Sequence, residues 1–151
     1  MPSRRQTLKQ SAAVAGLLAA AGLIPQSALA FNKAAFEAKN LNDALKALGS
    51  GAPAASTAVT LTAPDIAENG AVVPLALAST LPNVKQLVLL VEKNPNALVA
   101  VFNVTPEVDA SFSTRSKMGE SSDVYAVAIT ADGKAHFAKK EVKVTLGGCG
   151  G

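Results

Sequence analysis

The sequence ends in Thr-Leu-Gly-Gly-Cys-Gly-Gly, and this segment holds the residue best suited to covalent chemistry. Cys149 is the only cysteine of the chain, and two glycines lie on each side of it. A thiolate is a strong nucleophile that forms disulfide-type bonds with sulfur compounds. The residues around Cys149 therefore decide which thiol chemistry is open to it.

Three interpretations of this thiol can be weighed against its neighbours. A buried structural cysteine needs apolar neighbours, and a catalytic thiol needs a nearby cation, a helix N-terminus or a histidine. The tail supplies none of these. A carrier arm fits better, because glycine has the widest backbone freedom and three extended residues would place the sulfur roughly 10 Å beyond the last strand. We favour a carrier whose cargo is attached to Cys149 and whose arm consists of Gly147, Gly148, Gly150 and Gly151.

Few other side chains invite a chemical role. His136 is the only histidine, and a lone histidine among lysines is more often a surface side chain. Lysines of the same segment could steer anions, although protection of a solvated strand edge is the simpler interpretation; they are Lys134, Lys139, Lys140 and Lys143. Tyr125 and Arg115 belong to no motif. One cysteine and one histidine cannot form a metal site alone, so we expect no metal and no cofactor beyond a covalent sulfur adduct on Cys149.

Residues 1–30 are typical of an export signal. Arg4 and Arg5 lie in Ser-Arg-Arg-x-x-Leu-Lys, which resembles the bacterial twin-arginine signal. An uncharged apolar run and Ala-Leu-Ala follow, so we expect cleavage after Ala30. The expected location is the periplasm, reached in folded form through the twin-arginine pathway, with no membrane segment after cleavage. An ordinary secretory signal or a membrane anchor is the alternative, but the run is short for a span.

Removal of the signal changes the charge. The chain has 14 basic and 11 acidic residues, and three of the basic residues leave with the signal, so 11 of each remain. The net charge of the remaining chain is near zero, so it lacks the excess of basic residues that nucleic-acid binding requires. The remaining 121 residues suffice for one domain, which we place at 31–146, followed by the arm at 147–151.

Beyond the signal, the pattern is that of an all-β protein. Apolar residues at helical spacing predict one short helix over 40–48, ended by glycine. Turn signals such as Asp132-Gly133 then separate about seven short strands, expected at 58–63, 71–78, 84–91, 97–104, 110–118, 124–131 and 134–146. This pattern predicts an antiparallel β-sandwich with a short N-terminal helix and a flexible C-terminal Gly-Gly-Cys-Gly-Gly arm. Pro74 should mark an edge strand or a bulge.

Two of these strands are apolar at consecutive positions. Residues 87–91 and 97–102 do not alternate as strands with one wet face should. A second layer must therefore cover them. Either the N-terminal helix or a loop would do so, or a permanent partner subunit would.

The C-terminal stretch VKVTLGGCGG, 142–151, resembles the signature of the SoxY family, the sulfur carriers of the bacterial Sox thiosulfate-oxidising system. The resemblance includes the leader and the Asp132-Gly133 turn. It extends through PDIAENGAVVP at 64–74, EKNPNALVAVFNVTP at 92–106 and STRSKMGESSDVYAVA at 113–128. Residues 134–137 depart from the family, in which adjacent aromatics are common at this place.

The resemblance implies an immunoglobulin-like sandwich that pairs with a second sandwich subunit, SoxZ. It also implies that the haem protein SoxAX links thiosulfate to Cys149, that SoxB hydrolyses the adduct, and that SoxCD oxidises the remaining sulfane sulfur. Cys149 would then be a substrate attachment site on a carrier, and the chain would not be an enzyme. Two alternatives remain from the residues themselves. They are an exported single-cysteine thiol oxidoreductase or transferase, and an assembly module that uses an intermolecular disulfide.

Overall fold

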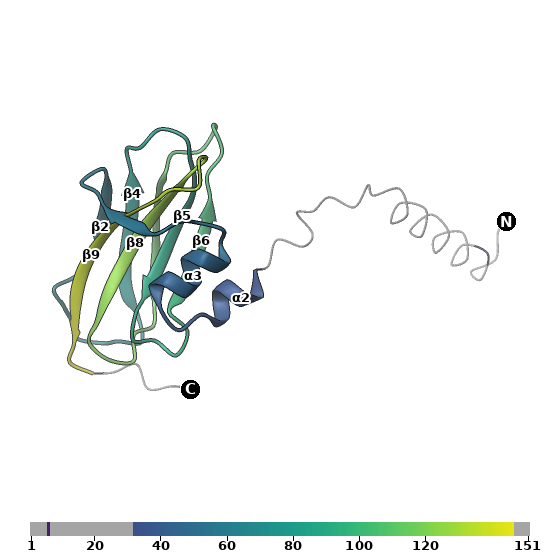
Figure 1. The fold of residues 1–151 in the computed structure, drawn as a ribbon. Coiled ribbons are helices and arrows are strands. Elements are labelled where there is room, and N and C mark those ends of the chain that lie inside the picture. Colours follow the sequence, from purple (N-terminus) through teal and green to yellow (C-terminus); the bar gives the residue numbers. More distant parts are fainter. Residues whose placement is uncertain (1–5, 7–31, 147–151) are drawn as a thin grey trace. The chain divides into compact units, whose positions relative to one another are not determined.

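The computed structural model describes Gln6 and residues 32–146, and the account below concerns the unit that begins at Lys33 (Figure 1). The expected signal with Arg4 and Arg5, the cleavage point after Ala30 and the arm that carries Cys149 lie outside the described residues.

Two β-sheets pack face to face. The larger sheet has the strand order β1-β9-β8-β5-β6, with β3 beside β9. Its strands are β1 (Pro53–Ala55), β3 (Ile66–Ala67), β5 (Val84–Val91), β6 (Leu98–Asn103), β8 (Ser122–Thr130) and β9 (Ala135–Val144). The smaller sheet consists of β2 (Val59–Thr62), β4 (Val73–Ser79) and β7 (Ser111–Ser116), with β4 in the middle. The longer strands pair antiparallel, whereas β1 and β3 both pair parallel with β9.

The first hydrophobic core lies between the two sheets. In β4 the side chains alternate, and Val73, Leu75 and Leu77 are buried. They pack against inward residues of the larger sheet, such as Leu87 and Leu89. This alternation is the pattern of a sheet with one face against the core and one against water.

A second core lies on the other face of the larger sheet, under α2 (Lys33–Glu37) and α3 (Leu41–Ala47). Figure 1 shows both helices in front of this sheet. Leu45 of α3 is 1% exposed and packs in the cluster that contains Val88 and Leu90 of β5. The helices therefore supply the cover that the consecutive apolar residues of β5 require, and of these alternatives the N-terminal helix is the one observed.

All seven expected strands and the expected helix form, within a few residues of the expected ends. The described residues also contain β1, β3 and α2, which the pattern did not predict. The expectation that Pro74 marks an edge strand or a bulge is wrong, because β4 is central and pairs regularly with β7. Pro74 is tolerated because β2 pairs with β4 only as far as Ala76, so its missing N–H is not needed on that side.

No helix within residues 32–146 has the length and apolar character needed to cross a membrane.

Candidate functional site

The last described residues of the chain are held firmly in the fold. We call residues 143–146, which lead directly to the Cys149 segment, the arm base. The Lys143 amide donates to the Asp65 carbonyl (3.0 Å), and the Thr145 amide donates to the Ala67 carbonyl (3.1 Å). The amide of Gly70 donates to the carbonyl of Leu146 (2.8 Å). β3 and the turn that follows it therefore clamp one side of the arm base.

The other side of the arm base is held by the segment before β8. The amide of Val144 donates to the Ser121 hydroxyl oxygen (2.9 Å). These two flanking segments are also bonded to each other, since the amide of Met118 donates to the Gly70 carbonyl (2.7 Å). The chain consequently leaves the sandwich from a fixed point at Leu146.

Three loop segments gather at this end of the sandwich. Besides 64–72 and 117–122, the turn 92–97 joins through Asn94, whose side-chain amide donates to the Lys117 carbonyl (2.7 Å). Lys93 adds a bond from its amide to the Ser122 hydroxyl (3.0 Å). These segments contain much of the sequence that resembles the SoxY family, which the fold thus concentrates around the arm base.

Large apolar side chains are exposed in the same region. Among the described residues, four large hydrophobic side chains are exposed, and three of them belong to the arm base or its clamp: Ile66 (58%), Val72 (54%) and Leu146 (70%). The fourth, Val108, lies in the loop between β6 and β7. Sequence analysis missed this group, because the apolar residues come from separate segments that only the β3–β9 pairing brings together.

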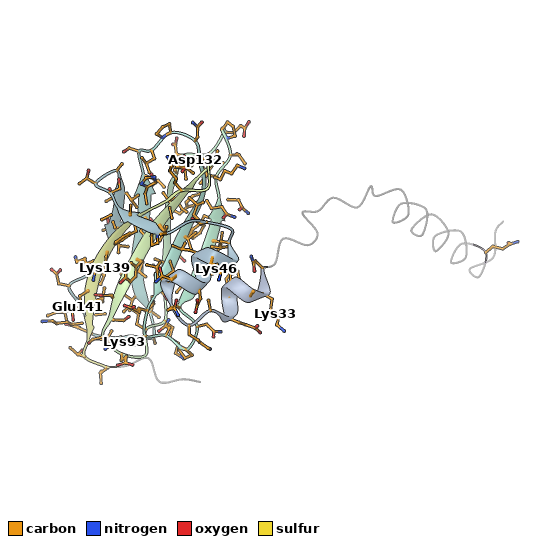
Figure 2. The ribbon with its side chains drawn as sticks, in the orientation of Figure 1. Lys33, Lys46, Lys93, Asp132, Lys139 and Glu141 are labelled. Atoms are coloured by element: carbon orange, nitrogen blue, oxygen red, sulfur yellow. The ribbon has the colours of Figure 1, made fainter. Side chains whose placement is uncertain are left out.

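His136 lies far from the arm base along β9. It lies near the start of β9, beside Ala128 of β8 and Ala54 of β1. Nine residues separate His136 from Thr145, which corresponds to about 30 Å along a strand. Figure 2 shows Asp132, in the turn before β9, at one end of the sandwich and Lys93 at the other. The His136 side chain is half-buried, whereas the sequence suggested a surface side chain.

Most of the lysines considered for anion steering already have acidic partners. Lys134 pairs with Asp132 (3.3 Å), Lys139 with Asp123 (3.0 Å) and Lys140 with Asp65 (2.9 Å). The hydrogen bond to Asp123 and the nearby Tyr125 raise the pKa of Lys139. Burial, followed by the charge of Glu92, raises the pKa of Tyr125. Of the four lysines, only Lys143, at the arm base, has no ion pair within residues 32–146.

Within the same residues, no group of three His, Cys, Asp or Glu side chains lies close enough together to hold a metal ion.

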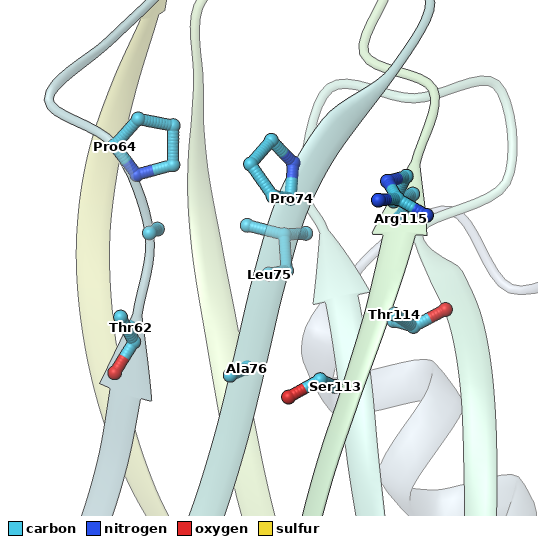
Figure 3. Close-up of a pocket in the computed structure, with 9 residues that line it drawn as sticks. Thr62, Pro64, Pro74, Leu75, Ala76, Ser113, Thr114 and Arg115 are labelled. Atoms are coloured by element: carbon cyan, nitrogen blue, oxygen red, sulfur yellow. The ribbon is translucent and has the colours of Figure 1, made fainter.

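A groove of about 800 Å³ opens on the outer face of the smaller sheet (Figure 3). It lies where β2 and β7 end and β4 begins, and Figure 3 shows Pro64, Pro74 and Arg115 standing along it. Ala76 and Ser113, which are paired in register, also line the groove. Sequence analysis gave Arg115 no role, since nothing in the local sequence indicates that it faces Pro64 across three strands.

The fold and the site define a β-sandwich protein that presents its C-terminal segment from one end. A family model described as sulfur oxidation protein SoxY matches residues 44–149, and the chain belongs to this family. The match ends at the position of Cys149.

Solved structures agree with this assignment. The sulfur carrier protein SoxY from Chlorobium limicola f thiosulfatophilum is 35% identical, with a TM-score of 0.64 over 71% of this chain and 97% of that chain. Two superoxide reductase (neelaredoxin) structures from Ignicoccus hospitalis share the fold alone, at 16% and 15% identity. Each has a TM-score of 0.51, and they cover 57% and 70% of this chain and 78% and 89% of their own. A comparison with curated proteins gave no match.

Proposed function

We propose that this protein is a periplasmic sulfur carrier that holds thiosulfate-derived groups on Cys149 while partner enzymes act on them. The observation that carries the proposal is the family match, which includes Cys149 in its last position. The anchored arm base supports it, because a flexible arm can present its cargo reproducibly only if the residues from which it extends are fixed. The exposed Ile66, Val72 and Leu146 at the arm base and its clamp add an apolar surface that an enzyme could bind.

The proposed role requires two reactions at Cys149, attachment of thiosulfate and hydrolysis of the attached group. In loading, its thiolate sulfur forms a bond to the outer sulfur of thiosulfate, and two electrons pass to the haem partner, leaving cysteine S-thiosulfonate. In hydrolysis, water attacks the terminal sulfonate sulfur and the S–S bond to it breaks. Sulfate and two protons leave, and the inner sulfur stays on Cys149 as a persulfide. Both steps need groups that partner enzymes supply, such as those of the SoxAX, SoxB and SoxCD type, so the carrier itself provides attachment and position.

A SoxZ-like subunit is the proposed permanent partner, and β6 is the edge that best suits it. This strand is at the end of the larger sheet, and Leu98–Asn103 contains no charge and no proline. Natural proteins usually protect such an edge with lysine, proline or a covering segment. Export of the pair in folded form would explain a twin-arginine signal on this chain. Replacement of Arg4 and Arg5 by lysine should leave the protein in the cytoplasm, as measured by cell fractionation.

The function is tested by mass spectrometry of the protein from cells oxidising thiosulfate. We expect thiosulfonate and sulfane-sulfur adducts on Cys149, and we expect a Cys149→Ser strain to lose thiosulfate oxidation. Thr145→Ser is a suitable control because it keeps a hydroxyl at the arm base and leaves the thiol intact. An unmodified Cys149 together with an active Cys149→Ser strain would refute the carrier role. Turnover by the purified protein alone would favour a thiol oxidoreductase or transferase, and a dominant covalent dimer on non-reducing gels would favour a disulfide-linked assembly module.

A further inference from the structure

We propose that the groove at Arg115 is a docking site for the arm, residues 147–151, when Cys149 carries an anionic sulfur group. This proposal rests on the proposed function and deepens it, since it assigns the loaded arm a binding site on the carrier itself. It commits to a sulfonate-bearing occupant that belongs to the same chain.

The groove begins next to the arm base. Pro64, which lines the groove, is adjacent to Asp65, whose carbonyl accepts the Lys143 amide (3.0 Å). On the other side, Gly70 is bonded to Leu146 (2.8 Å), and Pro74 of the groove follows four residues later, at most about 14 Å along the chain. The sulfur of Cys149 lies three residues beyond Leu146, roughly 10 Å when extended. The distance of about 14 Å is the limit for a fully extended chain, and the thiosulfonate group on Cys149 and the long side chain of Arg115 both shorten the gap between them. The cargo of the arm can therefore reach the groove.

The charge of the groove suits an anion. Arg115 is exposed on β7, where its neighbours in the strand are Ser and Thr. It makes no ion pair and no hydrogen bond with another described side chain. No acidic residue lines the groove. A guanidinium can donate two parallel hydrogen bonds to a sulfonate or carboxylate. The same arginine could thus hold the thiosulfonate oxygens on Cys149.

The shape of the groove suits a glycine-rich chain. Its floor is formed by small side chains, Ala76 and Ser113, while the rings of Pro64 and Pro74 stand at its sides (Figure 3). A segment without bulky side chains can lie close to such a floor. An exposed ion pair of this kind should favour the docked arm by about two- to fivefold, which holds the arm without preventing its release to an enzyme.

The test uses adducts prepared on the purified protein, so that it does not depend on loading in cells. Tetrathionate converts Cys149 to the S-thiosulfonate, because the thiolate forms a bond to an inner sulfur and thiosulfate leaves with the electron pair of the central S–S bond. Two methanethiosulfonate reagents supply matched adducts, a neutral methylthio group and a cationic trimethylammonioethylthio group. Amide NMR signals of Ala76, Ser113 and Arg115 report whether the groove is occupied.

We expect the anionic adduct to shift these three signals, and the neutral and cationic adducts to leave them near their positions in the reduced protein. Arg115→Ala should abolish the shifts and Arg115→Lys should retain part of them. Lys143→Ala is the matched control, since it removes one positive charge at the arm base but outside the groove, and it should keep the shifts. Equal groove shifts for all three adducts, shifts confined to residues 143–146, or shifts that persist in Arg115→Ala would each overturn the proposal. Absence of adducts on Cys149 in cells would instead refute the carrier function and leave this result standing.

Discussion

At the scale of single residues, Asp132 has the most strongly perturbed carboxyl group within residues 32–146. It lies in the turn between β8 and β9, where the Thr130 hydroxyl and then the Lys134 backbone amide donate to it. These hydrogen bonds lower the pKa of Asp132 from 3.8 to about 2. Because the pKa is lower in the folded state, the charged carboxylate stabilises the fold fully above about pH 4, and that stabilisation is lost as the pH falls toward about 2.

The expected consequence concerns Asp132→Asn, which keeps a hydrogen-bond acceptor and removes the charge. The variant should unfold at lower urea concentration than the wild type at pH 7, and the gap should close between pH 4 and pH 2. Urea midpoints at pH 7, 4 and 2 measure it. Asp109→Asn removes an exposed carboxylate that makes no ion pair in the described residues and should show no such pH-dependent gap. A constant gap for Asp132→Asn would contradict the assigned cause.

The sequence alone predicts the role of some of these residues but not of others. The special character of Cys149 can be predicted because its neighbours in sequence are all that matter for an arm made of glycine. Arg115 and Ile66 could not be recognised in this way. Their importance depends on which strands pair, and the partners of Arg115 in the groove come from positions about 40 and 50 residues earlier in the chain.

At the scale of elements, the β8–β9 hairpin is where local sequence and structure agree most closely. The Asp132-Gly133 signal predicts a tight turn, and Gly133 adopts a positive φ of 81°. No atom lies within 4 Å of the place a Cβ would take there, so an alanine meets backbone strain alone.

Gly133→Ala should therefore lower the free energy of unfolding by about 1 kcal/mol. Gly119→Ala is the matched control, since it also meets no atom within 4 Å and its backbone does not have a positive φ. It should leave the stability nearly unchanged. Urea unfolding of both variants decides the point, and equal effects would show that the turn conformation is not the cause.

The helical cover is the second element whose contribution can be measured. Leu45 of α3 is buried against Val88 and Leu90, and removal of its side chain leaves a cavity over the larger sheet. We expect Leu45→Ala to cost about 3 kcal/mol of unfolding free energy. The exposed Leu146→Ala should change it by less than about 0.5 kcal/mol. Chemical denaturation with both variants tests whether α3 stabilises the sheet, and a small effect at Leu45 would argue that the cover is loosely packed.

The sequence predicted the long elements because each has its own periodicity, as in β4, or its own continuous apolar run, as in β5. It could not predict β3, because two residues carry no period. It could not predict the parallel pairing of β1 and β3 with β9 either, since that pairing is long-range. Yet β3 is the element that clamps the arm base, so the part of the site that was missed is the part built by tertiary contacts.

At the scale of the whole molecule, the sandwich has two different ends. One end carries the β8–β9 turn with Asp132, Gly133 and the only histidine, and the other carries the arm base with its clamp and the groove at Arg115. The candidate functional features gather at the second end, whereas His136 lies near the start of β9, at the first end. This division predicts that folding and carrier function can be separated by the position at which the chain is cut.

A chain ended after Leu146 should fold as stably as the full protein and carry no sulfur. Its new carboxylate can still accept the Gly70 amide, and the bonds of Val144 and Thr145 to Ser121 and Ala67 remain. A chain ended after Lys143 loses all three bonds and also the bond from the Thr145 hydroxyl to the Glu68 carbonyl (3.1 Å). It should lose about 4 kcal/mol, at about 1 kcal/mol for each bond. Thermal and urea unfolding of the two truncated proteins, with mass spectrometry for adducts, tests both statements. If ending the chain after Leu146 destabilised it as much as ending it after Lys143, residues 147–151 would have to contribute to the stability of the sandwich, and the arm would not be a separate appendage.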